Sequence, residues 1–232
     1  MTFDPKVTKE RLLDAAEGLF AAQGFDGTSL RAITSEAGVN LAAVNYHFRS
    51  KDELIQAVFA RRLEPINRRR LELLDECIAD TGKGLLPLER IIRALIKPAM
   101  DVDLNKPELA NFKTLMGRLH WDPKGMLKQL LAKQFGQLLT RFTKAFQRAL
   151  PDLAPEELSW RIHFMVGCMA HTLACRETVE VISGGLCDTS DVGGTRERLV
   201  FFIAAGMRSP VPELRKVSDS VQEPHAVKVP HA

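Results

Sequence analysis

The sequence predicts an all-α protein, and three observations favour this class. Apolar residues recur three and four positions apart along most of the chain, which is the spacing that places them on one face of a helix. No segment shows the strict alternation of apolar and polar residues that is typical of a half-buried strand. Glycines and prolines divide the pattern into segments of ordinary helix length, so the helices can be delimited in order.

The amino-terminal region predicts two helices before the first tight turn. The first spans residues 7–23 and ends at Gly24. The second spans residues 29–37, with Thr28 as its N-cap, because a threonine oxygen can accept a hydrogen bond from a free backbone N–H group of the first turn. Gly38 ends this helix, since glycine adopts the left-handed conformation without strain.

A third helix, residues 41–48, follows directly, with Asn40 as its predicted N-cap. Two short helices across a glycine turn form a helix-turn-helix, whose second helix fits the DNA major groove. Small outward side chains let such a helix approach base edges, and an asparagine such as Asn45 can make two hydrogen bonds to adenine. The predicted inward residues are Val39, Val44 and Phe48, and the predicted outward ones are Leu41, Ala42, Ala43, Asn45, Tyr46 and His47.

The far end of this helix suits contact with the DNA backbone. Tyr46 and His47 lie there, with Arg49 and Lys51 just beyond, and side chains of these types bind phosphate oxygens. The helical pattern by itself also fits a three-helix packing unit that has a polar outer face and no role in DNA binding.

A long helix begins after Ser50, which has the spacing of a capping box with Glu53. Pro65 lies inside this helix and is predicted to kink it or split it. The arginine run at residues 68–70 follows. A solvated helix face explains this run better than DNA contact does, because it lies well past the helix-turn-helix.

The remaining helices are predicted at residues 86–100, 108–120, 124–150, 156–182 and 195–207. The segment 209–232 contains four prolines with balanced charge, and we expect a disordered tail there. The predicted domains are therefore residues 1–51 for DNA binding, residues 52–208 for ligand binding and dimerisation, and residues 209–232 for the tail.

The last two predicted helices are apolar on more than one face. A single copy covers such helices poorly, whereas pairing with a second copy into a four-helix bundle buries them, so we expect a homodimer. A dimer presents two recognition helices to successive major grooves, about 34–36 Å apart. The expected DNA partner is therefore a near-palindromic operator in double-stranded DNA.

The middle helices contain many apolar residues and few converging polar ones. Methionine and phenylalanine linings adapt to an elongated ligand, which predicts a pocket for a small apolar effector. Each of these residues taken singly is explained better as part of the core. The candidate lining residues are Phe112, Met116, Leu119, His120, Trp121, Phe135, Phe142, Phe164, Met165 and Met169, among which His120 is a candidate anchor for a polar head group.

Composition and motif content argue against several other classes. The formal net charge is +3, and the first 60 residues contain eight acidic and six basic side chains, so a purely electrostatic DNA binder is not expected. No apolar run is long enough to span a membrane, and no apolar segment of a secretory signal begins the chain, so we expect a cytoplasmic protein without a membrane partner. No phosphate-binding loop, G-x-S-x-G or H-E-x-x-H motif occurs, so we expect neither enzymatic activity nor a cofactor.

Cys168, His171 and Cys175 share one predicted helical face, as metal ligands would. A structural zinc site needs four ligands, and no fourth is evident. We therefore expect no metal, and a helix interface of small, weakly polar residues explains the pattern better.

The segment AGVNLAAVNYHFRSKDEL closely resembles the signature of TetR-family transcription factors. The matching positions are Gly38, Val39, Asn40, Val44, His47, Phe48, Ser50, Lys51 and Leu54. The resemblance implies a ligand-responsive, DNA-binding regulator, and it implies that Arg31, in the helix before the turn, contacts bases. The chain departs from the family at Asn45, where a tyrosine is usual, and this departure favours a base-reading role for Asn45.

Within that family, NLAAVNYHF and the long downstream helices resemble the branch that senses long-chain fatty acids or their coenzyme A esters. We expect a repressor that such a ligand releases from its operator, because a ligand among the middle helices can shift the helix that follows Ser50. The alternative is an all-α scaffold that binds a protein partner through its apolar last helices. Salt-sensitive binding to a short palindrome distinguishes the regulator from the scaffold.

Overall fold

The structure is a computed structural model that describes residues 4–102, 106–119 and 126–211. These residues are almost entirely helical and contain no strand, so the predicted all-α class is confirmed. No helix among them is both long and apolar enough to cross a membrane. The predicted tail lies outside the described residues from position 212 onward.

The amino-terminal unit contains helices α1 (Pro5–Gly27), α2 (Leu30–Ala37) and α3 (Leu41–His47). The helical conformation of α1 is interrupted at Gly24, where φ is 79° and ψ is 171°, so the chain breaks at the predicted glycine but α1 resumes and ends at Gly27. Gly38 has φ of 61° and ψ of 40°, and its N–H group bonds to carbonyls of the last turn of α2. The left-handed glycine predicted for the turn is therefore present.

Thr28 is not the N-cap of α2, and the prediction of that role is wrong. Ser29 caps the helix, because its hydroxyl accepts a hydrogen bond from the N–H group of Ala32 at 3.1 Å. The buried Thr28 hydroxyl instead donates to the carbonyls of Gly24 at 2.9 Å and Leu19 at 3.2 Å. It therefore binds carbonyls on both sides of the break in α1 and helps to fix how that helix ends.

Helix α4 (Lys51–Thr81) is one continuous helix, so Pro65 does not split it. Its predicted cap is confirmed, since the Ser50 hydroxyl accepts from the N–H group of Glu53 at 3.1 Å. The Glu53 carboxylate accepts from the N–H group of Arg49 at 2.7 Å, one residue before the position expected for a capping box. Pro65 is exposed, and it lies where α4 leaves one core and enters another.

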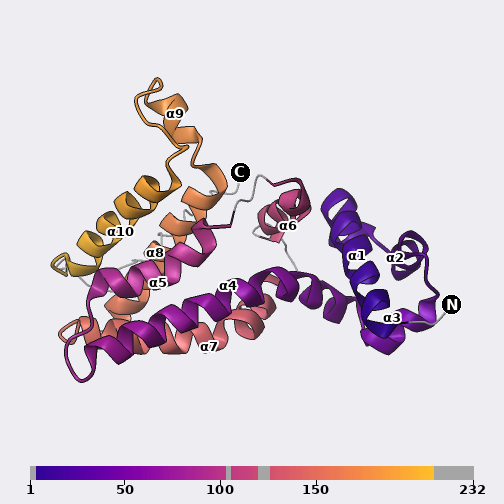
Figure 1. The fold of residues 1–232 in the computed structure, drawn as a ribbon, viewed down its shortest axis with the longest axis horizontal. Coiled ribbons are helices and arrows are strands. Elements are labelled where there is room, and N and C mark those ends of the chain that lie inside the picture. The colour runs from indigo at the N-terminus through magenta and orange to yellow at the C-terminus, as the bar shows by residue number, and fades with distance from the viewer. Residues whose placement is uncertain (1–3, 103–105, 120–125, 212–232) are drawn as a thin grey trace, which may run out of the picture.

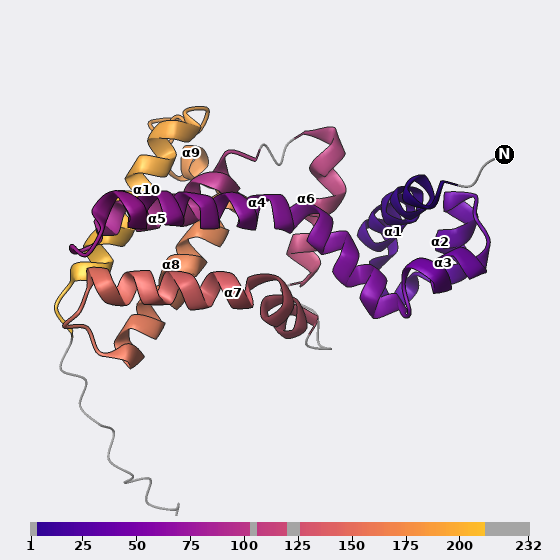
Figure 2. The ribbon, with the colours of Figure 1, turned by 60° about the horizontal axis from the view of Figure 1, so that its bottom comes forward.

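The carboxy-terminal part consists of a bundle of helices beyond this point. They are α5 (Leu88–Met100), the 3-10 turn η1 (Pro107–Leu109), α6 (Ala110–Leu119), α7 (Met126–Ala149), α8 (Pro155–Cys175), α9 (Thr178–Ile182) and α10 (Val192–Arg208). Figures 1 and 2 show α4 and α7 lying side by side along the molecule, with α1–α3 at one end and α8 and α10 toward the other.

The single helix predicted at residues 156–182 is two helices in the structure. After α8, the N–H groups of Val179 and Glu180 bond to the carbonyls of Arg176 and Glu177, three residues back rather than four. This tighter pattern ends the α-helical ladder, and α9 projects away from the body of the bundle (Figure 1). The last helix begins at Val192, earlier than predicted, because the Asp191 carboxylate accepts from the N–H group of Gly194 at 2.8 Å.

Two hydrophobic cores follow from this arrangement. The first joins α1–α3 to the first part of α4, and it also includes Phe112 and Leu115 of α6. The second joins the last part of α4 to α5, α7, α8 and α10. The half-buried Phe135 of α7 packs against both cores.

A buried carboxylate reinforces the first core. Glu17 of α1 is 3% exposed and pairs with Arg61 and Arg62 of α4. Arg61 also binds Asp14 at 2.6 Å, and Arg62 donates to the backbone carbonyl of Glu108 at 3.2 Å. Helices α1 and α4 and the turn η1 are therefore held together by polar contacts as well as by packing.

The arginine run at residues 68–70 is only partly the solvated face that the sequence indicates. Arg69 is exposed and pairs with Glu72 and Glu76, each at 3.1 Å. Arg70 is 4% exposed and bonds to groups inside the second core, so the prediction is wrong for this residue. Helical geometry explains the difference, because consecutive residues lie about 100° apart around the axis and cannot all face solvent.

We expect Gly38→Ala to lower the free energy of unfolding by about 1–3 kcal/mol, because alanine is strained in this backbone conformation. An added Cβ would also lie 2.7 Å from a terminal nitrogen of Arg11. The matched control is Gly136→Ala in α7, where an added Cβ meets nothing within 4 Å. There we expect the free energy of unfolding to rise by about 0.5–1 kcal/mol, because alanine favours the helix more than glycine does. Chemical denaturation of both variants measures the difference, and equal effects would contradict the assigned role of Gly38.

Candidate nucleic-acid interface

Helix α3 is held by two side chains that point into the first core. Val44 is fully buried and Phe48 is 3% exposed, as the sequence predicts. The opposite face carries Leu41, which is 42% exposed, and Tyr46, which is 77% exposed. This face of α3 is therefore open to solvent and accessible to a partner.

The other predicted outward residues divide into two groups. Ala42 and Asn45 are exposed, whereas Ala43 and His47 are half-buried. Ala43 packs against the first core, so its methyl group faces inward more than the sequence indicates. The Asn45 side chain forms no hydrogen bond within the part of the chain that the structure describes, so its whole amide is available to a ligand.

Asn40 and the turn before it fix where α3 begins. The Asn40 side-chain oxygen accepts from the N–H group of Ala43 at 3.0 Å, which confirms the predicted cap. The Asn40 amide nitrogen donates to none of the described residues, so it can donate to a ligand at the N-terminus of α3. The cap and the Gly38 turn together set the angle between α2 and α3.

The far end of α3 carries an aromatic pair. The Tyr46 and His47 rings lie 4.9 Å apart with an interplanar angle of 83°, an edge-to-face arrangement. His47 lies 6.1 Å from the ring of Phe48, which is buried. The Tyr46 ring thus contacts the His47 ring, while most of the Tyr46 surface faces solvent.

Basic side chains surround α3 without lying on it. Arg31 of α2 and Arg49 before α4 are exposed, and Lys51 in the first turn of α4 is half-buried. Arg11 of α1 reaches toward the Gly38 turn. This pattern gives a nearly uncharged recognition surface with cations at its margin, which suits base contacts at the centre and phosphate contacts at the edges.

The residues predicted to line an effector pocket are not gathered in one place. Phe112 belongs to the first core, with its ring 6.3 Å from that of Phe59. Phe142 and Met165 are buried in the second core, while Phe135 borders both cores. These predicted lining residues instead fill space between helices.

The remaining predicted pocket residues lie nearer the surface or outside the described part. Met116 and Phe164 are exposed, and Met169 is half-buried against the second core. Leu119 ends α6 but its side chain is not described, and His120 and Trp121 lie outside the described residues. The ring of Phe164 stacks on that of Trp160 at 5.9 Å on the outer face of α8.

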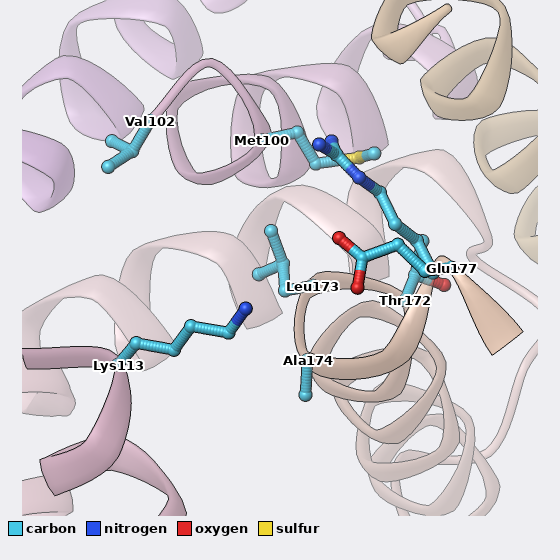
Figure 3. Close-up of a pocket in the computed structure, with 8 residues that line it drawn as sticks. Met100, Val102, Lys113, Thr172, Leu173, Ala174 and Glu177 are labelled. Atoms are coloured by element: carbon cyan, nitrogen blue, oxygen red, sulfur yellow. The ribbon is translucent and has the colours of Figure 1, made fainter. Parts of the chain in front are cut away.

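A pocket does lie where the end of α5, helix α6 and the end of α8 meet, as Figure 3 shows. Its lining residues are Met100, Val102, Lys113, Thr172, Leu173, Ala174, Arg176 and Glu177. None of these belongs to the predicted set. Sequence spacing gives no signal for them because they come from three segments, and the fold alone brings those segments together.

Comparisons with known proteins agree with this geometry. Residues 12–58 match the family model described as bacterial regulatory proteins of the tetR family, and residues 93–206 match the tetracyclin repressor-like C-terminal domain. The chain is 30% identical over 136 residues to the uncharacterised HTH-type transcriptional regulator TtgW of Pseudomonas putida, over 59% of this chain and 92% of that protein. It is 29% identical over 143 residues to the regulator SrpR of the same species, over 62% of this chain and 61% of SrpR.

The fold is also shared with solved structures. A SmeT–triclosan complex has a TM-score of 0.59 at 19% identity, and the match covers 89% of this chain and 99% of that chain. The helix-turn-helix unit and the helical bundle define a class of bacterial regulators that bind DNA. The chain belongs to the TetR family of transcriptional regulators, as its signature segment predicts.

Proposed function

We propose that this TetR-family protein is a repressor that binds a near-palindromic operator as a homodimer and leaves it when a small apolar effector binds. The observation that supports this most directly is the outer face of α3, which is exposed, nearly uncharged and rigidly seated on Val44 and Phe48. We assign DNA binding to residues 1–51, and effector binding and dimerisation to residues 52–208.

The proposed roles of the interface residues follow from their positions. Asn45 reads bases together with Leu41, Ala42 and the exposed edge of Ala43, since their side chains are small or can pair with base edges. Arg31 approaches the same groove from α2. Tyr46, His47, Lys51 and the free amide of Asn40 bind phosphate oxygens.

Dimerisation is proposed through α8 and α10. Their outer faces expose large apolar side chains: Trp160 at 54%, Phe164 at 60%, Phe201 at 60% and Phe202 at 68%. Several large apolar side chains exposed on two packed helices of a folded protein favour an interaction site there. Helices from two copies would cover it as a four-helix bundle, and the two α3 helices would then face successive major grooves.

The proposed effector is a long-chain fatty acid or its coenzyme A ester. This proposal rests on the resemblance of the NLAAVNYHF segment to a lipid-sensing branch and on the apolar composition of the bundle. The SmeT–triclosan complex, which has the same fold, supports a small-molecule effector. The effector would act by shifting α4, which joins the bundle to the DNA-binding unit.

The direct test of the proposed function is genomic footprinting with the purified protein. We expect protection of a short palindrome, with contacts repeated about one helical turn apart. Binding without sequence preference, or no binding to DNA, would favour the scaffold interpretation.

We expect Asn45→Ala to lower the preference for the operator over random DNA by about 1–3 kcal/mol, because a base-edge contact is lost. Tyr46→Ala and Lys51→Ala should weaken binding to operator and to random DNA to a similar extent. They should also reduce the dependence of the DNA affinity on salt concentration. Fluorescence anisotropy at several salt concentrations measures both effects, with Lys83→Ala, just beyond the far end of α4, as the control. If Asn45→Ala weakens operator and random DNA equally, the assigned roles are wrong.

We expect the wild-type protein to sediment at about twice 25.9 kDa and Phe202→Glu to sediment as a monomer, because a buried unpaired carboxylate would oppose the interface. Leu85→Glu is the matched control, since Leu85 is 70% exposed but lies in the turn before α5. Analytical ultracentrifugation at micromolar concentration measures the masses. A wild-type monomer, or a dimer that survives Phe202→Glu, would contradict the proposed interface.

We expect dodecanoate, used as an acyl probe, to weaken operator binding, and operator DNA to weaken dodecanoate binding by the same factor. Thermodynamic linkage requires this equality whenever one ligand changes the affinity for another. Calorimetric titration of dodecanoate with and without operator measures the factor. Equal dodecanoate affinities in the two titrations would show that an acyl chain is not an effector.

A further inference from the structure

Among the residues that the structure describes, Arg70 is a buried cation without an acidic partner. Its side chain lies in the second core at 4% exposure, and burial lowers the pKa of its guanidinium to about 10, so it remains charged at neutral pH. The described ion pairs of the neighbouring Arg61, Arg62 and Arg69 involve carboxylates, whereas Arg70 takes part in none of them. A buried charge normally has a partner of opposite sign, because its transfer from water is costly.

The described acceptors around Arg70 are all neutral. Its Nε donates to the Leu95 carbonyl at 2.7 Å, and one terminal nitrogen donates to the Asn67 side-chain oxygen at 3.0 Å. Asn67 is itself fixed, since its amide nitrogen donates to the Gln134 carbonyl at 2.9 Å. The guanidinium is therefore oriented by α4, α5 and α7 without being neutralised.

The second terminal nitrogen of Arg70 has a much weaker acceptor. It faces the sulfur of Met169 on α8 at 3.7 Å, and a thioether is a weak hydrogen-bond acceptor. Met169 is half-buried, and methionine side chains change shape easily. The side of the guanidinium that faces α8 can therefore accept a better partner if Met169 moves.

The pocket in Figure 3 begins one helical turn beyond Met169. Leu173 and Thr172 of α8 line it together with Met100 of α5, the helix whose Leu95 carbonyl binds Arg70. Figure 3 shows Lys113 extending from the α6 side toward Leu173 and Ala174. The apolar side chains of Met100 and Leu173 thus lie at the pocket, and Met169, whose sulfur contacts Arg70, lies one turn earlier on α8.

We propose that Arg70 binds the anionic group of an amphipathic effector, which displaces the Met169 sulfur and leaves its apolar body along Met100 and Leu173. This inference rests on the proposed effector-binding function and specifies its chemistry: an organic anion, with a carboxylate as the simplest case. Such an anion would supply a counter-charge, and charge-assisted hydrogen bonds to a guanidinium are stronger than those to neutral acceptors. It would also bind α4 directly, through a residue of the same helix that begins beside α3.

The test compares dodecanoate with dodecan-1-ol, which has the same chain and no charge, by calorimetry on the full-length protein without DNA at neutral pH. We expect dodecanoate to bind at least about tenfold more tightly. Arg70→Met should abolish that preference while leaving the alcohol affinity unchanged. Arg69→Met is the matched control, because Arg69 is the exposed neighbour paired with Glu72 and Glu76.

Two further measurements keep the outcome clear if Arg70→Met does not fold. Met169→Ala should increase the affinity for dodecanoate more than that for the alcohol, because it removes the group that the anion displaces. Lys113→Met should change the preference for dodecanoate over dodecan-1-ol little, since Lys113 lies at the pocket rather than behind Met169. The proposal would be overturned if the wild-type protein bound dodecanoate and dodecan-1-ol equally well. It would also be overturned if Lys113→Met abolished the preference for dodecanoate and Arg70→Met did not.

The DNA-free readout separates this inference from the proposed function. Carboxylate-selective binding that depends on Arg70 but does not release operator would support the site and contradict the regulatory role of the acyl ligand. Release of operator by dodecanoate without charge selectivity would support the regulatory role and contradict the site at Arg70.

Discussion

Helix α4 contributes buried side chains to both hydrophobic cores, and the geometry of the whole protein depends on this sharing. Leu54, Val58 and Phe59 pack with α1–α3, while Leu74 and Cys77 pack with the carboxy-terminal bundle. The exposed proline of this helix lies between the two sets and does not interrupt it. The bundle end of α4 and the DNA-binding unit are therefore connected by one continuous helix.

Two other features strengthen this connection. Phe112 and Leu115 of α6 are part of the amino-terminal core, although the same helix carries a lysine to the pocket. Glu17 is buried between Arg61 and Arg62, and loss of both arginines would leave its buried charge without compensation. Helices α1, α4 and α6 are consequently packed against one another, and both α4 and α6 extend from the amino-terminal core toward the bundle.

Features that depend on neighbours within about four residues are predictable from the amino-acid sequence. The caps at Asn40 and Ser50, the Gly38 turn and the buried face formed by Val44 and Phe48 are of this kind, because local hydrogen bonds and helical spacing set them. The signature segment identifies the family for the same reason, since the residues proposed to recognise DNA are concentrated in one short stretch of chain.

Contacts between distant segments, in contrast, are set by packing and become visible only in the folded chain. The burial of Arg70 depends on α5 and α8 covering one side of α4, the role of Thr28 depends on how α1 ends, and the pocket is assembled from three segments. Spacing along the chain specifies the face on which a residue lies, but not which other helix covers that face. The apolar residues of the middle helices are therefore recognisable as a face from their pattern, whereas their division among core, pocket and exposed surface follows from how the helices pack.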